Sequence, residues 1–226
     1  MKSFVFKIFI IAVFLSSQAF AQSQLVKNLR KGKHQVLVVY GTSLTAGDGG
    51  RAWVDSVGTG LNKKYGGNLT VLNTAKSAMW SGWGVQNLED SVINKKPDAV
   101  MIEFGMNDAF LNYKTSPALA RLNLIYMIDR IKLYNPACEV ILQVMDIPIN
   151  VHAEARPNLT AYYEMYRQVA VDRRLLLIDH YPHWQRILDQ GKDLYLKYVP
   201  DGIHPSPASA KSIIAPYVLK RLEEGD

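Results

Sequence analysis

The sequence predicts an α/β protein in which a five-stranded parallel sheet lies between two layers of helices. Five short apolar runs, each bounded by turn residues, have the composition of strands that are buried on both faces. Segments with the apolar spacing of helices separate these runs, and such alternation favours a doubly wound, three-layer α/β/α sandwich. The five runs comprise residues 36–40, 69–72, 99–104, 140–145 and 175–178.

Helices are predicted where apolar residues recur every three or four positions between the strands. The last helix is predicted to begin at Ser206 and Pro207 and to run to about Leu222, because serine caps free N–H groups and proline fits the first helical position. The polar and basic segment 22–33 is expected to be loosely held. Helical spacing is shown by Trp53, Val57, Leu61 and Tyr65, by Leu122, Ile125, Ile128 and Ile131, and by Tyr162, Met165 and Val169.

Residues 1–21 have the pattern of a secretory signal peptide. A basic start is followed by an apolar run over residues 8–15 and by Ala19-Phe20-Ala21, which has small residues at the cleavage spacing. A membrane anchor is the alternative, but this run is well short of the roughly 20 residues that span a bilayer. We therefore expect a secreted or periplasmic protein without stable membrane insertion, in which residues 22–226 form a single domain.

The composition argues against several other classes of protein. Hydrophobic residues make up 48% and charged residues 20% of the chain, which is typical of a globular domain. The formal net charge of +6 is spread along the sequence and lacks the dense basic stripe of a nucleic-acid groove, so no nucleic-acid partner is expected. Cys138 opens an apolar run, and we expect it to be a small buried side chain rather than a nucleophile.

Two loops of the predicted sheet carry a candidate nucleophile and a candidate base. Ser43 follows the first strand and Gly41, although a Gly-Thr-Ser sequence is equally typical of a turn or a helix cap. Among the five histidines, His204 alone has a carboxylate three residues before it, Asp201. An aspartate that holds one imidazole nitrogen leaves the other free to accept a serine proton. The three residues Ser43, His204 and Asp201 are therefore the predicted catalytic group.

Asn107 is a candidate for stabilising an oxyanion, because its amide directly follows the third predicted strand. The carboxyl ends of parallel strands meet at one edge of the sheet, which places Asn107 and Ser43 at the same edge. The remaining histidines show no spacing of a metal site, and we expect neither a metal nor an organic cofactor. Of these histidines, His180 follows a predicted strand and is the candidate to line the pocket.

Three segments, Gly41-Thr42-Ser43-Leu44-Thr45, Gly105-Met106-Asn107-Asp108 and Asp201-Gly202-Ile203-His204-Pro205, resemble ordered blocks of the SGNH/GDSL hydrolases, the GDSL-like lipase/acylhydrolase family. The resemblance covers nearly all of residues 22–226. It implies a flavodoxin-like fold and hydrolysis of esters through an acyl-serine intermediate. In that family an aspartate usually stands where this chain has Thr42, a position that is not catalytic.

The resemblance also implies an oxyanion hole formed by the N–H group of Ser43, a second backbone N–H group and the side chain of Asn107. The family has a glycine for the second N–H group, and the corresponding residue here is Ala78, with Gly82 as the alternative. An alanine supplies the same N–H group provided that the turn does not require a positive φ.

The resemblance implies an esterase, acetylesterase, thioesterase or lysophospholipase, and secretion favours a small-molecule or glycan ester as the substrate. We expect short acyl groups, favouring acetyl groups on carbohydrate, with Trp80 and Trp83 as substrate-binding faces or, equally, as core residues. Trp53 fits a helix face and is expected in the core. The alternatives are a lysophospholipase or thioesterase, and a non-catalytic glycan-binding module on the same fold. A nucleotide binder is disfavoured, since no G-x-G-x-x-G motif follows the first strand.

Overall fold

A computed structural model describes residues 22–224 and contains the predicted parallel sheet. The predicted signal peptide, residues 1–21, lies outside the described residues. The strand order is β2-β1-β3-β4-β5, and all four pairs are parallel. Each strand lies within one residue of its predicted bounds: β1 (Gln35–Gly41), β2 (Leu69–Asn73), β3 (Ala99–Glu103), β4 (Glu139–Val144) and β5 (Leu176–Asp179).

The order of the strands reverses between β1 and β3. The chain leaves β1 toward β2 on one side, whereas β3 leads to β4 and β5 on the other side. In the sheet register Leu37 of β1 is paired with Val71 of β2 and with Ala99 of β3. In open parallel sheets a crevice forms at the carboxyl ends of the strands where the order reverses, so the ends of β1 and β3 are the expected place for a site.

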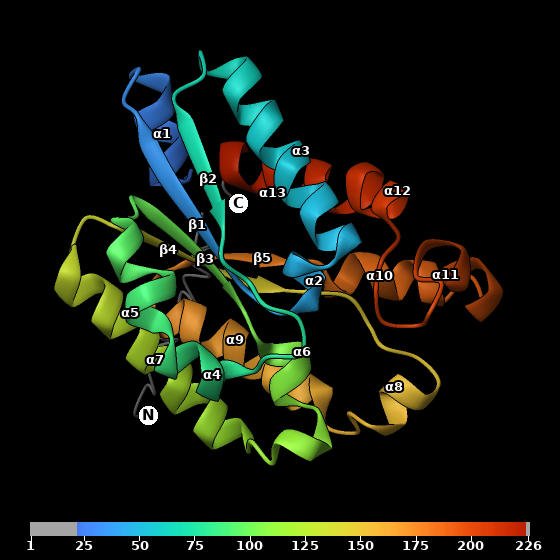
Figure 1. The fold of residues 1–226 in the computed structure, drawn as a ribbon. Coiled ribbons are helices and arrows are strands. Elements are labelled where there is room, and N and C mark those ends of the chain that lie inside the picture. Colours follow the sequence, from blue (N-terminus) through green and yellow to red (C-terminus); the bar gives the residue numbers. More distant parts are fainter. Residues whose placement is uncertain (1–21, 225–226) are drawn as a thin grey trace, which may run out of the picture.

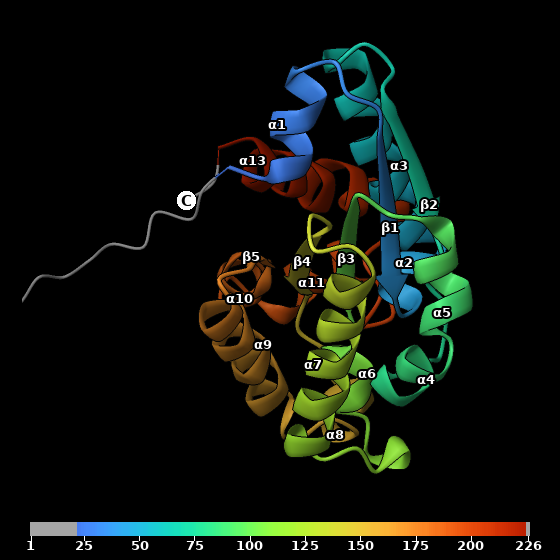
Figure 2. The same ribbon diagram turned by 90° about the vertical axis from the view of Figure 1, so that its left-hand side faces the viewer.

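Helices cover both faces of the sheet, as the two views in Figure 1 and Figure 2 show. One face carries α1 (Gln24–Arg30), α3 (Asp48–Lys64) and α13 (Ala215–Glu224). The other face carries α4 (Ser81–Gln86), α5 (Leu88–Ser91), α7 (Pro117–Tyr134) and α9 (Leu159–Arg173). The remaining elements are α2 (Ser43–Ala46), η1 (Ile93–Lys95), α6 (Gly105–Asp108), η2 (Leu111–Tyr113), α8 (Val151–Glu154), α10 (Tyr181–Leu188), α11 (Lys192–Tyr198), α12 (Pro207–Ser209) and η3 (Ala210–Ile214).

The apolar residues whose spacing predicts helix α7 are not all buried in it. Ser116 caps the helix by accepting a hydrogen bond from the N–H group of Leu119, and Pro117 occupies its first turn. Ile128 and Ile131 are buried, but Leu122 is 64% exposed. The buried stripe runs through Leu124 and its neighbours one turn on, and Leu122 lies on the opposite side of the helix.

The last helical stretch begins where the sequence predicts. The Ser206 hydroxyl accepts a hydrogen bond from the N–H group of Ser209 at 3.2 Å, and Pro207 is the first residue of α12. The stretch is not one regular helix, because η3 has the wider π-type winding between α12 and α13. Leu222, near its end, is fully buried.

The prediction that segment 22–33 is loosely held is wrong. Residues 24–30 form α1, which buries Leu25, Val26 and Leu29. The carboxylate of Glu139, at the start of β4, accepts hydrogen bonds from the N–H groups of Gln24 and Leu25 at the first turn of this helix. A carboxylate at a helix N-terminus accepts hydrogen bonds from the free N–H groups and interacts favourably with the helix dipole.

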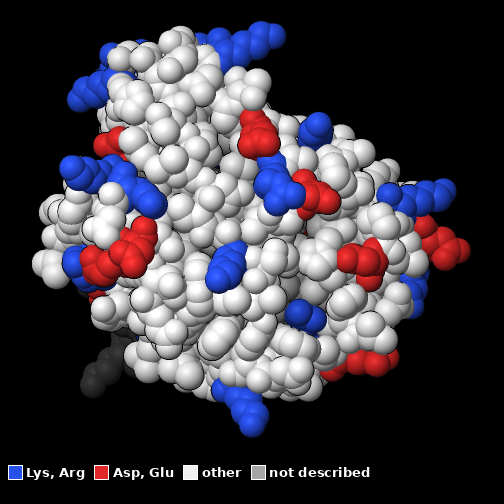
Figure 3. Space-filling model, viewed as in Figure 1, with Lys and Arg blue, Asp and Glu red and all other residues white. Residues whose placement is uncertain are grey.

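Charged side chains are dispersed on the face in Figure 3, where lysines and arginines are separated by acidic residues and uncharged surface. Cys138 is buried as predicted, and burial raises the pKa of its thiol to about 12. None of the helices within residues 22–224 has the length and apolarity needed to cross a bilayer.

Candidate active site

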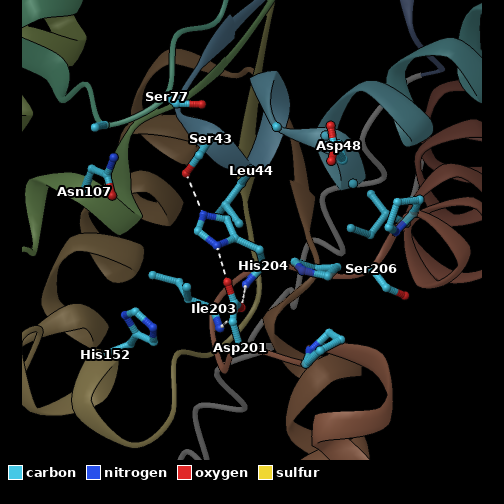
Figure 4. Close-up of a pocket in the computed structure, with 18 of the residues that line it drawn as sticks. Ser43, Leu44, Asp48, Ser77, Asn107, His152, Asp201, Ile203, His204 and Ser206 are labelled. Carbon is cyan, nitrogen blue, oxygen red and sulfur yellow. Dashed lines mark hydrogen bonds and ion pairs between the residues drawn. The ribbon is translucent and has the colours of Figure 1, made fainter.

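A pocket of about 710 Å³ opens at the carboxyl ends of β1 and β3, where the strand order reverses. Figure 4 shows Ser43 and His204 at its centre, with Asn107 and Ser77 on one side and Asp48 on the other. Its lining residues are Ser43, Leu44, Gly47, Asp48, Gly49, Gly50, Ser77, Ala78, Asn107, Phe110, Tyr113, His152, Arg156, Pro200, Asp201, Ile203, His204, Pro205, Ser206, Pro207 and Ile214.

Ser43 is presented by a sharp transition from β1 into the short helix α2. Gly41 is required at the end of the strand, because a Cβ atom there would overlap the carboxylate of Glu103. Thr42 then caps α2, and its hydroxyl accepts a hydrogen bond from the N–H group of Leu44 at 3.2 Å. Ser43 is the first helical residue, and within residues 22–224 its N–H group donates to no protein group. This leaves a free donor beside the hydroxyl group.

The side chains of Ser43, His204 and Asp201 form a continuous hydrogen-bonded row. The Ser43 Oγ atom lies 2.8 Å from Nε2 of His204. The Nδ1 atom of the same imidazole lies 2.7 Å from Oδ2 of Asp201. Both distances are within hydrogen-bond range, and the order of groups is that of a nucleophile, a general base and the carboxylate that orients the base.

The loop that carries His204 is shaped by Asp201 itself. Its Oδ1 atom accepts hydrogen bonds from the N–H groups of Ile203 at 3.0 Å and His204 at 2.7 Å. Gly202 between them has φ +86°, a conformation that favours glycine. Partial burial raises the pKa of Asp201, but the hydrogen bonds from His204 and Ile203 outweigh it and hold that pKa below its usual value. Asp201 is therefore ionised at neutral pH.

Asn107 belongs to α6, directly after β3, and is buried. Its Nδ2 atom donates a hydrogen bond to the carbonyl oxygen of Met79 at 2.8 Å. A side-chain amide has two N–H donors, so this bond leaves one donor at the pocket that Asn107 lines. Such a donor is what an oxyanion hole requires.

Ala78 lines the pocket, but its backbone has a positive φ. Alanine was expected to fit only if the turn did not require one. Its φ is +58°, the left-handed conformation that glycine adopts without strain. The turn is held by the hydroxyl of Tyr113, which donates to the carbonyl oxygen of Ala78 at 2.7 Å. In the described part of the chain, the N–H group of Ala78 has no protein acceptor. The alternative, Gly82, lies within α4 and does not line the pocket.

Residues 39–211 match the model of the GDSL-like Lipase/Acylhydrolase family. The chain belongs to this family. An arylesterase from Vibrio mimicus is 26% identical to it over 196 residues, which cover 82% of this chain and 87% of the relative. The family assignment and this relative make the protein a serine carboxylic ester hydrolase.

Solved structures of GDSL-type enzymes share the fold. The lipase/acylhydrolase from Enterococcus faecalis is 24% identical, with a TM-score of 0.69 over 83% of this chain and 95% of that one. An acetylxylan esterase from Geobacillus stearothermophilus is 21% identical, with a TM-score of 0.72 over 85% and 96% of the two chains. At this level of identity the likeness shows the fold alone. It confirms the predicted α/β architecture.

The predicted roles of two tryptophans do not match their positions in this GDSL-type hydrolase. Neither Trp80 nor Trp83 lines the pocket. The Trp80 ring stacks on Tyr113 with 4.7 Å between centroids, and it is Tyr113 that borders the pocket. Trp83 packs against Tyr40 instead. Trp53 is buried as predicted, and its indole N–H donates to the carbonyl oxygen of Leu44.

His180 is also absent from the pocket lining. It is buried at the end of β5, where its Nε2 atom lies 2.9 Å from Nε2 of Gln143. Burial lowers its pKa to about 3, so the imidazole is neutral at physiological pH. Within residues 22–224 no group of three histidines, cysteines or acids is arranged to hold a metal ion.

Thr42, which stands where the family usually has an aspartate, is hydrogen-bonded to the carboxylate of Glu103. The carboxylate of Glu103 is fully buried and accepts hydrogen bonds from the Thr42 N–H group at 2.7 Å and from the Thr42 and Thr45 hydroxyls at 2.9 Å. Burial raises its pKa to about 7, although these hydrogen bonds favour the ionised form. Glu103 therefore supplies, from the neighbouring strand, a carboxylate that ties the serine loop to the sheet.

Sequence reasoning missed several residues that line the pocket. Phe110 and Tyr113 follow Asn107 in a loop with no catalytic motif. His152 and Arg156 come from the segment around α8, far along the chain from the three family blocks. Aromatic residues soon after the Asn107 block were a usable signal for the first two, whereas nothing in the local sequence marks Arg156.

Proposed function

We propose that Ser43 is the nucleophile that carries the ester hydrolysis of this enzyme. His204 accepts the Ser43 proton as Oγ attacks the acyl carbon, and it then donates that proton to the departing alcohol. A water molecule, deprotonated by the same imidazole, releases the acid and restores Ser43. Asp201 holds the imidazole in the required tautomer. The observation that supports this role most strongly is the 2.8 Å separation of Ser43 Oγ from His204 Nε2, which disfavours a non-catalytic glycan-binding module.

The oxyanion of each tetrahedral intermediate requires fixed donors. We assign the N–H groups of Ser43 and Ala78 and the remaining amide N–H of Asn107 to this role. The two backbone groups have no protein acceptor within the described part of the chain, and all three residues line the same pocket. Donors that are already in place stabilise the developing charge without reorganisation during the reaction.

The preferred natural substrate that we propose is an acetyl ester on carbohydrate. The His204 and Asp201 side chains are 45% and 50% exposed, so the reacting bond of a bulky alcohol can reach Ser43 in an open groove. Asp48 borders both this pocket and a second depression along α3. Most of the residues that line that depression have polar side chains: Asp48, Arg51, Asp55, Ser56, Thr59 and Lys211. The acetylxylan esterase with the same fold acts on an ester of this class.

A second candidate is favoured by the apolar side of the pocket. Leu44, Ile203 and Ile214 belong to its lining together with three prolines. Such a wall suits an aryl ester or a longer acyl chain, and the Vibrio mimicus relative is an arylesterase. Each methylene that this wall buried would contribute about 0.8 kcal/mol.

Acyl-chain length tests for a long-chain acylhydrolase, and acetate release from a sugar tests for a carbohydrate rather than an aryl leaving group. We would measure kcat/KM for p-nitrophenyl esters from acetate to decanoate, together with acetate release from acetylated xylo-oligosaccharides, using Ser43→Ala as the blank. The proposal expects acetate to exceed octanoate and the oligosaccharide to release acetate. A steady rise toward decanoate, with no acetate released from any glycan, would overturn the proposal and favour the lysophospholipase or thioesterase alternative.

Secretion is part of the same proposal. The segment that would begin the mature chain is packed on the fold: the Ser23 hydroxyl donates to Glu139, and the Ser23 N–H group donates to the carbonyl oxygen of Leu222. The support for cleavage after Ala21 is the sequence pattern of residues 1–21. N-terminal sequencing of enzyme from the periplasm or medium should read Gln22-Ser23-Gln24. Active enzyme confined to the cytoplasm with Met1 retained would refute secretion.

A further inference from the structure

Arg156 is a nearly buried arginine that contacts Asn107, the proposed oxyanion donor. It follows α8, is only 8% exposed, and lines the pocket. Its Nε atom donates to the carbonyl oxygen of Met106 at 2.9 Å, and Nη1 donates to that of His152 at 3.3 Å. The guanidinium also lies over the ring of Phe110, 4.8 Å from its centroid. These contacts hold its planar group in one orientation.

The remaining nitrogen of this guanidinium faces Asn107. Nη2 of Arg156 lies 3.4 Å from Oδ1 of Asn107, a long hydrogen bond to the oxygen of the amide. The nitrogen of the same amide donates to the carbonyl oxygen of Met79. A flipped amide would place Nδ2 against a cation that only donates and Oδ1 against a carbonyl that only accepts. The two partners together therefore fix which end of Asn107 is a donor at the pocket.

The charge of Arg156 is not neutralised by an ion pair. Within residues 22–224 no carboxylate oxygen lies within 4.0 Å of its nitrogens. A buried charge that lacks an ion pair is costly, and burial strengthens its interaction with a neighbouring amide. A positive charge at this place polarises the Asn107 amide to which Arg156 donates.

We propose that Arg156 is a positioning residue for the oxyanion hole, which orients the Asn107 amide through Oδ1 and strengthens its free N–H group as a donor. The inference rests on the proposed role of Asn107. Arg156 does not itself touch the reacting atoms. It acts through Asn107, and its contribution is greatest when negative charge develops on the substrate oxygen.

A double-mutant cycle tests this coupling. We would measure kcat and KM for p-nitrophenyl acetate with Arg156→Gln and Arg156→Lys, each in the parent enzyme and in Asn107→Ala. Loss of a hydrogen bond from a charged group predicts that Arg156→Gln lowers kcat by about 10- to 100-fold, with KM changed less than about threefold. Lysine keeps the charge but not the planar fork, so Arg156→Lys should fall between glutamine and arginine.

In the Asn107→Ala background the same Arg156 substitutions should lower kcat by less than about threefold, because the group through which Arg156 acts is gone. The control is Arg121→Gln, which removes an exposed arginine paired with Asp172 on the surface and should leave kcat unchanged. Melting temperatures identify any variant that fails to fold. If Arg156→Gln does not fold, the Arg156→Lys cycle measures the coupling in its place.

A second readout uses an inhibitor that forms an oxyanion-like adduct. The rate of inactivation by diethyl p-nitrophenyl phosphate should fall in parallel with kcat/KM across the Arg156 variants. Equal losses of kcat with and without Asn107, or a loss confined to KM, would overturn the positioning role. If Asn107→Ala itself leaves kcat unchanged, the oxyanion assignment of Asn107 fails first, and that result is distinguishable from the failure of Arg156 alone.

Discussion

Asp201 holds His204 at two points: Oδ2 lies 2.7 Å from the ring Nδ1 atom, and Oδ1 accepts from the His204 backbone N–H group at the same distance of 2.7 Å. One carboxylate therefore fixes both the loop and the tautomer. In Asp201→Asn the amide retains the shape, but its N–H₂ group replaces an acceptor of the ring proton. We expect kcat to fall by about 10²- to 10⁴-fold while the melting temperature changes little. Retention of the parent kcat by Asp201→Asn would remove Asp201 from the mechanism.

Asn107→Ala should lower kcat by roughly 10²- to 10³-fold with a smaller change in KM, because an oxyanion donor acts mainly in the transition state. Steady-state kinetics with p-nitrophenyl acetate measures both constants. Asn123→Ala is a matched control, since Asn123 donates to the Ser81 hydroxyl outside the pocket. A change confined to KM would show that Asn107 binds the ground state instead.

Ala78→Gly should stabilise the protein. An L-residue in the left-handed region costs roughly 1–2 kcal/mol, part of which is offset by the larger entropy of glycine in the unfolded chain. We therefore expect the free energy of unfolding to rise by about 0.5–1 kcal/mol, with kcat within about twofold, because the N–H group is kept. Ala78→Val, with a β-branched side chain at φ +58°, should destabilise the turn. Denaturant unfolding measures the free energy of unfolding of both variants. A destabilised glycine variant would contradict a left-handed conformation at Ala78.

Glu103 should make stability depend on pH. Burial raises its folded-state pKa to about 7 from an ordinary value of 4.5. Between these values the folded state holds a proton that the unfolded state has lost, so stability is lost as pH rises through this window. The shift corresponds to roughly 3 kcal/mol, since one pKa unit is about 1.4 kcal/mol.

Glu103→Gln removes that titration. The slope of the free energy of unfolding against pH should therefore lose the contribution of one proton between pH 5 and pH 7. The buried Asp108, whose pKa burial also raises to about 7, continues to titrate in the variant. Urea unfolding at several pH values measures both slopes. Identical slopes for the parent and Glu103→Gln would show that Glu103 is already ionised at pH 5.

The strands could be predicted from sequence within one residue because apolar runs end at turn residues, a local signal. The helix α1 could not, because its three buried side chains and the carboxylate of Glu139 that holds its first turn are brought together only by the fold. The strands and helices beside them place three site residues, which are Ser43, Asn107 and His204. For Trp80 the sequence left two roles open, since nearness in sequence to the site does not show that its ring stacks on Tyr113.

Chemical modification of the nucleophile is the sharpest test of the proposed mechanism. We would treat the enzyme with one equivalent of diethyl p-nitrophenyl phosphate and follow p-nitrophenol release, intact mass and the labelled peptide. We predict one adduct per chain on Ser43, with activity lost in proportion. His204→Ala should react slowly, and Ser43→Ala should remain unlabelled with kcat reduced by about 10³-fold or more. Stoichiometric labelling at another residue, or parent-like turnover by Ser43→Ala, would contradict this mechanism.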